Sequence, residues 1–302
     1  MFHLRSLILS ALFLIGLLFA SVQGLEGKEQ TDIKAKTRQN CLWQVSHKDK
    51  IMYIQGSIHL LRAQDYPLNS SIINAYEQAD SLVLEVDMNE ITKPAFMMSM
   101  IQEASLKDSS LETVLDEETY QYAKEKMASL GMKMKYYNRL KPWYMCTTVL
   151  VSRLSQLGFN ATLGLDQHFF KKAKKDSKEI IGLEEASEQM TIMSKASGLD
   201  PNRYVRMSFE DIDNIEEQMD SLVQSWREGN LAGLEPLLAS LDDYPEIYNI
   251  ILKERNHKWI PQLKKCLLSD KTHFVVVGAL HMVGPDSILK LLEKEGYTLK
   301  QL

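Results

Sequence analysis

The chain has few cysteines, and their spacing excludes several familiar kinds of site. Only three occur among its 302 residues, Cys41, Cys146 and Cys266, which is too few for a disulfide framework. Their separations contain no CxxC or CxxxC pair, so a local zinc-ribbon site is excluded. If the protein is exported, the three cysteines could form one disulfide bridge and leave one buried thiol. We expect the three side chains to serve packing.

An excess of positive charge is also missing. The formal net charge is −5, so nothing in the composition recruits nucleic acid or an anionic membrane surface. Hydrophobic residues make up 45% of the chain and charged residues 25%, as in a globular protein that can bury a sizeable core. These values do not distinguish a peptide from a small-molecule ligand, and they leave the oligomeric state open.

No apolar run is long enough for a comfortable membrane span. A short basic start ends at Arg5, and the apolar run from Leu7 to Ala20 has 14 residues, whereas a span needs about 20. Small residues follow at 21–24. We predict that residues 1–24 are a signal peptide and that the protein is periplasmic or secreted after cleavage. The alternative is an uncleaved anchor, the only case in which we expect a membrane partner. Loss of the leader, whose single charge is Arg5, would make the net charge −6.

What the chain does contain is one pattern at both ends. Gly56-Ser57-Ile58-His59 and Gly278-Ala279-Leu280-His281 each follow an apolar run typical of a buried strand. The histidine should therefore lie just beyond the carboxyl end of its strand, where open α/β sheets bind ligands. Neutral imidazole is also the commonest metal ligand. We predict that His59 and His281 meet at one metal site. The alternative is that each histidine caps a turn or satisfies a buried backbone group.

Several acids occupy similar positions. Strand alternation in residues 82–87 places Glu85 and Asp87 on one side, at the carboxyl end of an apolar strand. A carboxylate buried there must be paired, hydrogen-bonded or bound to metal, and pairing with a Lys or Arg is the structural alternative. Two Gly-Leu-acid phrases end in Asp166 and Glu184. Glu184 closes a strand and could face the same crevice, whereas Asp166 could merely cap the helix that follows it.

The pattern of elements predicts an α/β core after a flexible lead-in at 25–40, and the length allows one large domain with insertions or two modest domains. Helical stretches at 94–160 and 186–268 should interrupt this core. Methionines crowd into the first insertion and could form core, a lid or an adaptable binding surface. Strands are expected at 41–45, 51–55, 81–86, 179–181, 272–277 and 297–299. Pro285 should open the last helix, which carries Ile288, Leu291 and Leu292.

The motifs together resemble those of the TraB/GumN family, whose animal relatives are the Tiki metalloproteases. The segments that carry the resemblance are GSIHLL, LVLEVD, GLDQHFFKKA, IIGLEEASEQ, ERNHKW and FVVVGALHMVGPDSILKLLEKEGY, in this order from Cys41 to Leu302. The resemblance implies a single domain over residues 41–302 with the fold shared by ChaN-like haem-binding and erythromycin-esterase-like proteins. In that fold, a central mixed sheet is built from two GxxH-containing half-repeats and carries large helical insertions. The resemblance also makes His59 and His281 the motif histidines, Glu85 the strand acid and Arg255 the site arginine. Ser57 stands where the family usually has threonine.

The chemistry that follows is metal-assisted hydrolysis of a peptide or ester bond. His59, His281 and Glu184 would hold a divalent ion, and nitrogen and oxygen ligands without thiolate permit Mn, Co or Zn. Glu85 would take a proton from the attacking water, and Arg255 would donate to the oxyanion. Peptides follow from the Tiki resemblance and esters from the wider fold.

The alternative function is that of a non-enzymatic, ChaN-like haem- or metal-binding protein that uses the same cleft. Tyr136 and Tyr137 could then serve as haem ligands, although both suit a packing role as well.

Overall fold

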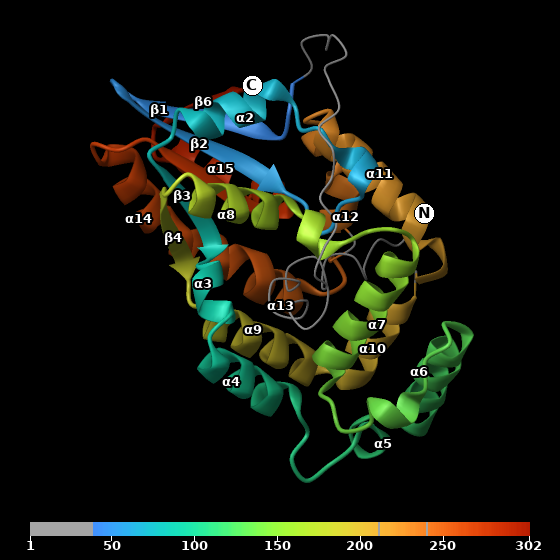
Figure 1. The fold of residues 1–302 in the computed structure, drawn as a ribbon. Coiled ribbons are helices and arrows are strands. Elements are labelled where there is room, and N and C mark those ends of the chain that lie inside the picture. Colours follow the sequence, from blue (N-terminus) through green and yellow to red (C-terminus); the bar gives the residue numbers. More distant parts are fainter. Residues whose placement is uncertain (1–38, 211, 240) are drawn as a thin grey trace.

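A six-stranded mixed sheet forms the centre of the protein (Figure 1). The computed structural model describes residues 39–210, 212–239 and 241–302, so the predicted signal peptide and nearly all of the lead-in lie outside it. The strand order is β4-β3-β5-β2-β1-β6. Neighbours run parallel from β4 to β2, whereas β1 is antiparallel to both β2 and β6. The strands are β1 (Leu42–His47), β2 (Lys50–Ser57), β3 (Ser81–Val86), β4 (Glu179–Glu184), β5 (His273–Gly278) and β6 (Thr298–Gln301).

Helices cover both faces of the sheet. In Figure 1, α2 and α8 lie on one side and α14 and α15 on the other, and α3, α4 and α9 gather where the arrow of β3 points. The α-helices are α2 (Ser70–Glu77), α3 (Met88–Ile91), α4 (Pro94–Ala104), α5 (Leu111–Val114), α6 (Glu117–Ser129), α7 (Pro142–Gln156), α8 (Leu165–Lys175), α9 (Ala186–Leu199), α10 (Pro201–Phe209), α11 (Ile215–Arg227), α12 (Glu235–Ala239), α13 (Pro245–Tyr248), α14 (Glu254–Leu268) and α15 (Ile288–Lys294).

Single turns connect these helices. A π-helical turn, η6 (Asn249–Lys253), leads directly into α14. The 3₁₀ turns are η1 (Ala63–Asp65), η2 (Met134–Tyr136), η3 (Ala161–Leu163), η4 (Ile212–Asn214), η5 (Leu231–Gly233) and η7 (Ala279–Met282).

The predicted α/β class and mixed sheet are confirmed, and the local signals explain most element boundaries. The strand expected at 81–86 is β3 without change, and all six of its residues are buried. Asp116 caps α6 by accepting a hydrogen bond from the Thr119 amide at 2.7 Å. The two half-repeats stay a prediction.

One predicted boundary is wrong. Pro285 does not open the last helix, because Gly284 turns the chain with φ 84° and Ser287 is the N-cap. Its hydroxyl accepts the hydrogen bond from the Lys290 amide, so α15 begins at Ile288. A proline suits the first turn of a helix, but the side chain that can satisfy the free amides fixes the start.

The pairing of β2 with β5 brings the two GxxH motifs together. In this parallel pair, Gly56 faces Val277 and Ser57 faces Gly278. Both strands therefore end at the same edge of the sheet, and each motif histidine follows directly. Gly56 is needed for this packing, because a Cβ there would lie 2.5 Å from the Cys41 sulfur and 2.8 Å from the Met282 sulfur.

All three cysteines are free thiols, so the single bridge that the sequence left open is not formed. Cys41 and Cys146 are buried, and burial raises the pKa of each thiol to about 12. In the crowded first insertion, Met100 is buried whereas the side chain of Met98 on the same helix is exposed. Within the ranges described, no helix is both long and apolar enough to cross a membrane.

Candidate functional site

The two motif histidines and Glu85 converge on Gly278. A methyl group added to Gly278 would lie 3.3 Å from Glu85 Oε1, 3.5 Å from His281 Cδ2 and 3.6 Å from His59 Nε2. All three side chains are buried. They come from the carboxyl end of β3 and from the segments that follow β2 and β5. The expected meeting of His59, His281 and Glu85 at one sheet edge is therefore what the structure contains.

His59 is held by an acid that the sequence analysis had assigned only a possible capping role. Its Nδ1 lies 2.7 Å from Asp166 Oδ2, and the Ser57 hydroxyl donates to the same carboxylate at 2.9 Å. Asp166 lies in the first turn of α8, whose N-cap is Gly164. A side chain at Gly164 would overlap the carbonyl oxygen of His59. The glycine thus lets α8 approach the motif loop closely enough for Asp166 to reach His59.

This arrangement leaves the second imidazole nitrogen of His59 inside the protein, without a partner in the described part of the chain. His59 Nε2 is buried and has no hydrogen-bond partner among the residues described. Burial by itself lowers the pKa of His59, but the charge and hydrogen bond of Asp166 outweigh it and raise the pKa above its ordinary value. A buried nitrogen without a partner costs free energy, so His59 Nε2 is a candidate for contact with a ligand.

Arg255 lies between the two predicted glutamates. Its Nη2 donates to Glu85 Oε2 at 2.7 Å and to Glu184 Oε1 at 2.6 Å, and its Nε donates to both oxygens of Glu184 at 3.1 and 3.2 Å. The three side chains are buried. Burial opposes the charged guanidinium, but Glu184 and then Glu85 outweigh this effect and raise the pKa of Arg255.

Further hydrogen-bond donors satisfy the oxygens of the two carboxylates, Glu85 and Glu184. The Gly278 amide donates to Glu85 Oε1 at 2.7 Å, and the Trp259 indole donates to Glu184 Oε2 at 3.2 Å. Gln189 Nε2 bridges the acids, at 2.9 Å from Glu184 Oε1 and 3.3 Å from Glu85 Oε2. Since every carboxylate oxygen of this pair has at least one donor, two acids can remain buried side by side.

His281 is held in one tautomer by its neighbours. Its Nδ1 lies 2.5 Å from Asn256 Oδ1, so Nδ1 carries the proton and Nε2 is the acceptor. Nε2 receives a hydrogen bond from Arg255 Nη1 at 3.1 Å and lies 3.8 Å from Glu85 Oε1. Burial, the Arg255 charge and then His59 hold the pKa of His281 well below its ordinary value. The ring is therefore neutral.

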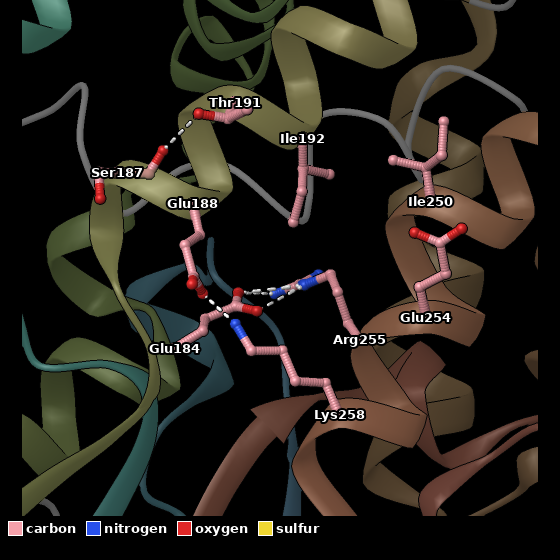
Figure 2. A pocket seen from close by; sticks show the side chains of 9 residues that line it. All are labelled: Glu184, Ser187, Glu188, Thr191, Ile192, Ile250, Glu254, Arg255 and Lys258. Atoms are coloured by element: carbon pink, nitrogen blue, oxygen red, sulfur yellow. Dashed lines mark hydrogen bonds and ion pairs between the residues drawn. The ribbon is translucent and has the colours of Figure 1, made fainter.

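A surface cavity opens beside Arg255 and Glu184. Its volume is about 350 Å³, and Figure 2 shows Arg255 and Glu184 facing each other at its centre, with the Glu188–Lys258 ion pair alongside. Ile192 and Ile250 provide apolar surface on another side. The buried charges can thus be reached from solvent on the side of Arg255.

The predicted residues divide between this cluster and other places. His59, His281, Glu85, Glu184 and Arg255 all belong to it. Asp87 does not, because its carboxylate caps α3 by accepting from the Asn89 amide at 2.9 Å. Tyr136 and Tyr137 lie on and after η2, and neither lines the cavity beside Arg255. Within the described ranges, no three His, Cys, Asp or Glu residues are already arranged to hold an ion.

Sequence analysis missed three members of the cluster. Gln189 and Asn256 lie in segments that carry the family resemblance, IIGLEEASEQ and ERNHKW, but neither polar side chain had a predicted role. Asp166 was noticed only as a possible cap. The sequence did contain a signal for Asp166, because it follows a Gly-Leu pair as Glu184 does. In the structure each of these two acids bonds to a residue of the cluster, Asp166 to His59 and Glu184 to Arg255.

The fold and this cluster define an α/β protein with a buried histidine, carboxylate and arginine site beyond the ends of its parallel strands. The sequence model of the TraB/PrgY/gumN family matches residues 41–301, and the chain belongs to this family. The predicted family resemblance is therefore confirmed.

Two curated relatives are similar over most of their length. Both carry the description "Uncharacterized protein YbaP", one from Escherichia coli (strain K12) and one from Shigella flexneri. Each is 21% identical over 242 residues, which cover 80% of this chain and 87% of YbaP. No solved structure gives a significant match.

The convergence point itself can be tested with Gly278→Ala. Gly278 has φ −51°, so alanine causes no backbone strain, but its methyl group would press on Glu85 Oε1 at 3.3 Å. We expect normal folding and a loss of about tenfold in the turnover of the hydrolase proposed below, because small displacements of reacting groups are costly. Gly131→Ala, at a position with open space around it and φ 75°, should instead lower stability slightly and leave activity unchanged. Equal activities in the two variants would contradict convergence at Gly278.

Proposed function

We propose that the cluster around Gly278 is the active site of an exported, metal-dependent hydrolase that acts on peptide or ester bonds. The observation that carries this proposal is the matched orientation of the two histidines. Each has Nδ1 against an oxygen, from Asp166 or Asn256, and each presents Nε2 to the side of Glu85. Metal-binding histidines are typically oriented by such a partner on the second ring nitrogen.

The charge balance supports a bound cation. Among the residues described, the three buried carboxylates of Glu85, Asp166 and Glu184 lie near one permanently charged group, the Arg255 guanidinium, which leaves a formal charge of −2 with His59 neutral. Buried negative charge without a counterion is unfavourable, and a divalent ion would offset it. Mixed nitrogen and oxygen donors suit Mn, Co or Zn.

The residues that would hold the ion are His59 and His281, with a carboxylate as third donor. His59 Nε2 has no partner to give up, whereas His281 Nε2 would exchange the hydrogen bond of Arg255 for the ion. Glu184, predicted as a ligand, has both oxygens on Arg255 and would have to exchange one of them. When bound, the ion would lower the pKa of a water molecule to about 7.

The remaining steps belong to the chain itself. Glu85 Oε1 lies on the side of both histidines and would accept the proton of the attacking water. Asp166 and Asn256 keep the two imidazoles from rotating. Arg255 fixes Glu85 and Glu184, and its positive charge at the cavity would stabilise the oxyanion as the bond breaks.

A metal and activity assay on the unmodified protein tests the proposal. Protein purified without chelators should contain about one equivalent of a divalent ion and cleave members of a fluorogenic peptide or ester library. Turnover should vanish with excess chelator and return with Mn, Co or Zn. Unchanged turnover in chelator would contradict the metal-dependent mechanism. A tightly bound haem or ion without turnover of any substrate would instead favour the binding protein that the sequence left as the alternative.

A further inference from the structure

A second cavity borders the one beside Arg255. The second cavity has a volume of about 510 Å³ and lies between α4 and α9, where Ser99 and Gln102 contribute to its wall. Ser187 and Thr191 line both cavities. These two residues lie one turn apart on the exposed side of α9, and Figure 2 shows them beside the first cavity. The two cavities therefore adjoin at these side chains and together reach from Arg255 and Glu184 to α4, and we call the pair the cleft.

The walls of this cleft alternate in character. The first cavity has apolar surface from Ile192 and Ile250, and the second from Leu106 and Met190. The exposed hydroxyl side chains of Ser187 and Thr191 lie between them. Hydroxyl groups both donate and accept hydrogen bonds, which matches the alternating N–H and C=O groups of an extended peptide. Apolar surface on either side matches its side chains.

The charged side chains that line the two cavities nearly balance. Glu184, Glu188 and Glu254 face Arg255 and Lys258 at the first cavity, and Glu103 faces Lys107 and Lys141 at the second. Lys258 pairs with Glu188 at the first, and Lys141 pairs with Glu103 at 2.6 Å at the second. A strongly charged ligand would therefore gain little along the cleft. An uncharged peptide backbone needs no charged partner along this surface.

We propose that this cleft binds an extended peptide segment whose residues beyond the reacting bond cross α9 at Ser187 and Thr191 and enter the second cavity. This inference rests on the proposed hydrolase function and adds the length of its substrate. Ser187 and Thr191 are four residues apart, about 6 Å along the axis of α9, and an extended chain advances about 3.3 Å per residue. A peptide that contacts both hydroxyl groups therefore has about two residues there, and the second cavity holds the residues after them.

The test measures how kcat/KM depends on peptide length, with the second cavity open and with it blocked. Gln102→Trp fills that cavity from an exposed position on α4, and Met98→Trp is the matched control, since Met98 is 58% exposed on the same helix and does not line the cavity. The substrates are fluorogenic peptides with one cleavable core, extended on either side by two or four residues. In the unmodified protein and in Met98→Trp, extension on one side should raise kcat/KM at least about tenfold. Gln102→Trp should lose this gain and keep full activity on the short core.

Other outcomes separate this inference from the proposed function. Cleavage that does not depend on peptide length, or an equal response of both tryptophan variants, would overturn the extended cleft and leave hydrolysis intact. If no peptide is cleaved, fluorescence anisotropy with labelled random tripeptides and nonapeptides decides. Tighter binding of nonapeptides that Gln102→Trp abolishes would support the cleft without hydrolysis, and equal binding of both lengths would overturn it.

Discussion

Replacing Arg255 by glutamine is expected to destabilise the protein by about 3–5 kcal/mol, the cost of removing one partner of a buried ion pair. Arg255 is only 4% exposed and is shared by Glu85 and Glu184. Its loss would leave two buried carboxylates close together without a permanent counterion. Glutamine has at most two N–H donors, so it cannot replace the three nitrogens that now donate to these acids and to His281.

Urea unfolding measures this loss, and Lys258→Gln is its matched control. Lys258 lies one turn further along α14 and pairs with Glu188 at the surface, where such a pair contributes about 0–1 kcal/mol. Glu85→Gln should cost less than Arg255→Gln, because Glu184 still pairs with Arg255. If Arg255→Gln were as stable as Lys258→Gln, the guanidinium would not be the counterion that stabilises the buried acids.

A loss of stability in Arg255→Gln would not mean that Arg255 has only a structural role. One arginine can support folding and catalysis at the same time. Here Arg255 lines the cavity and also binds both buried acids, so both effects are expected in one variant. Activity per folded molecule must therefore be measured beside stability.

The strands and the two histidines could be predicted because their signals are local. An apolar run that ends in Gly-x-x-His defines both the strand and the position of the histidine after it, as at Gly56 and Gly278. Glu85 was recognisable for the same reason, since a carboxylate inside an apolar strand needs a partner. In the structure its partners are Arg255 and the Gly278 amide.

The partners themselves could not be predicted, because they come from distant parts of the chain. Asp166 binds a histidine 107 positions earlier, and Arg255 binds an acid 71 positions earlier. An acid two residues after a glycine at a helix start is locally a helix-capping signal. Only the close approach of α8 to the His59 loop, which Gly164 permits, turns Asp166 into the partner of His59.

The largest functional loss is expected from His59→Ala. This change removes the buried Nε2 that has no protein partner, together with one of the two nitrogen donors proposed for the ion. We expect bound metal to fall below detection and turnover to fall by at least about 100-fold. Asp166 would keep the hydrogen bond from Ser57, so the free energy of unfolding should fall by only about 1–3 kcal/mol.

A graded pair of variants distinguishes this role from simple unfolding. Asp166→Asn keeps the shape of the side chain but removes the negative charge that orients His59, so metal affinity and activity should fall by about 10- to 100-fold, the scale for residues that position a metal ligand. His257→Ala removes a half-exposed histidine next to Asn256 on α14 and should change neither. The measurements are metal content by mass spectrometry, and turnover and thermal unfolding on the same samples. Full metal content in folded His59→Ala would refute the proposed ligand role and leave His59 as a buried structural partner of Asp166.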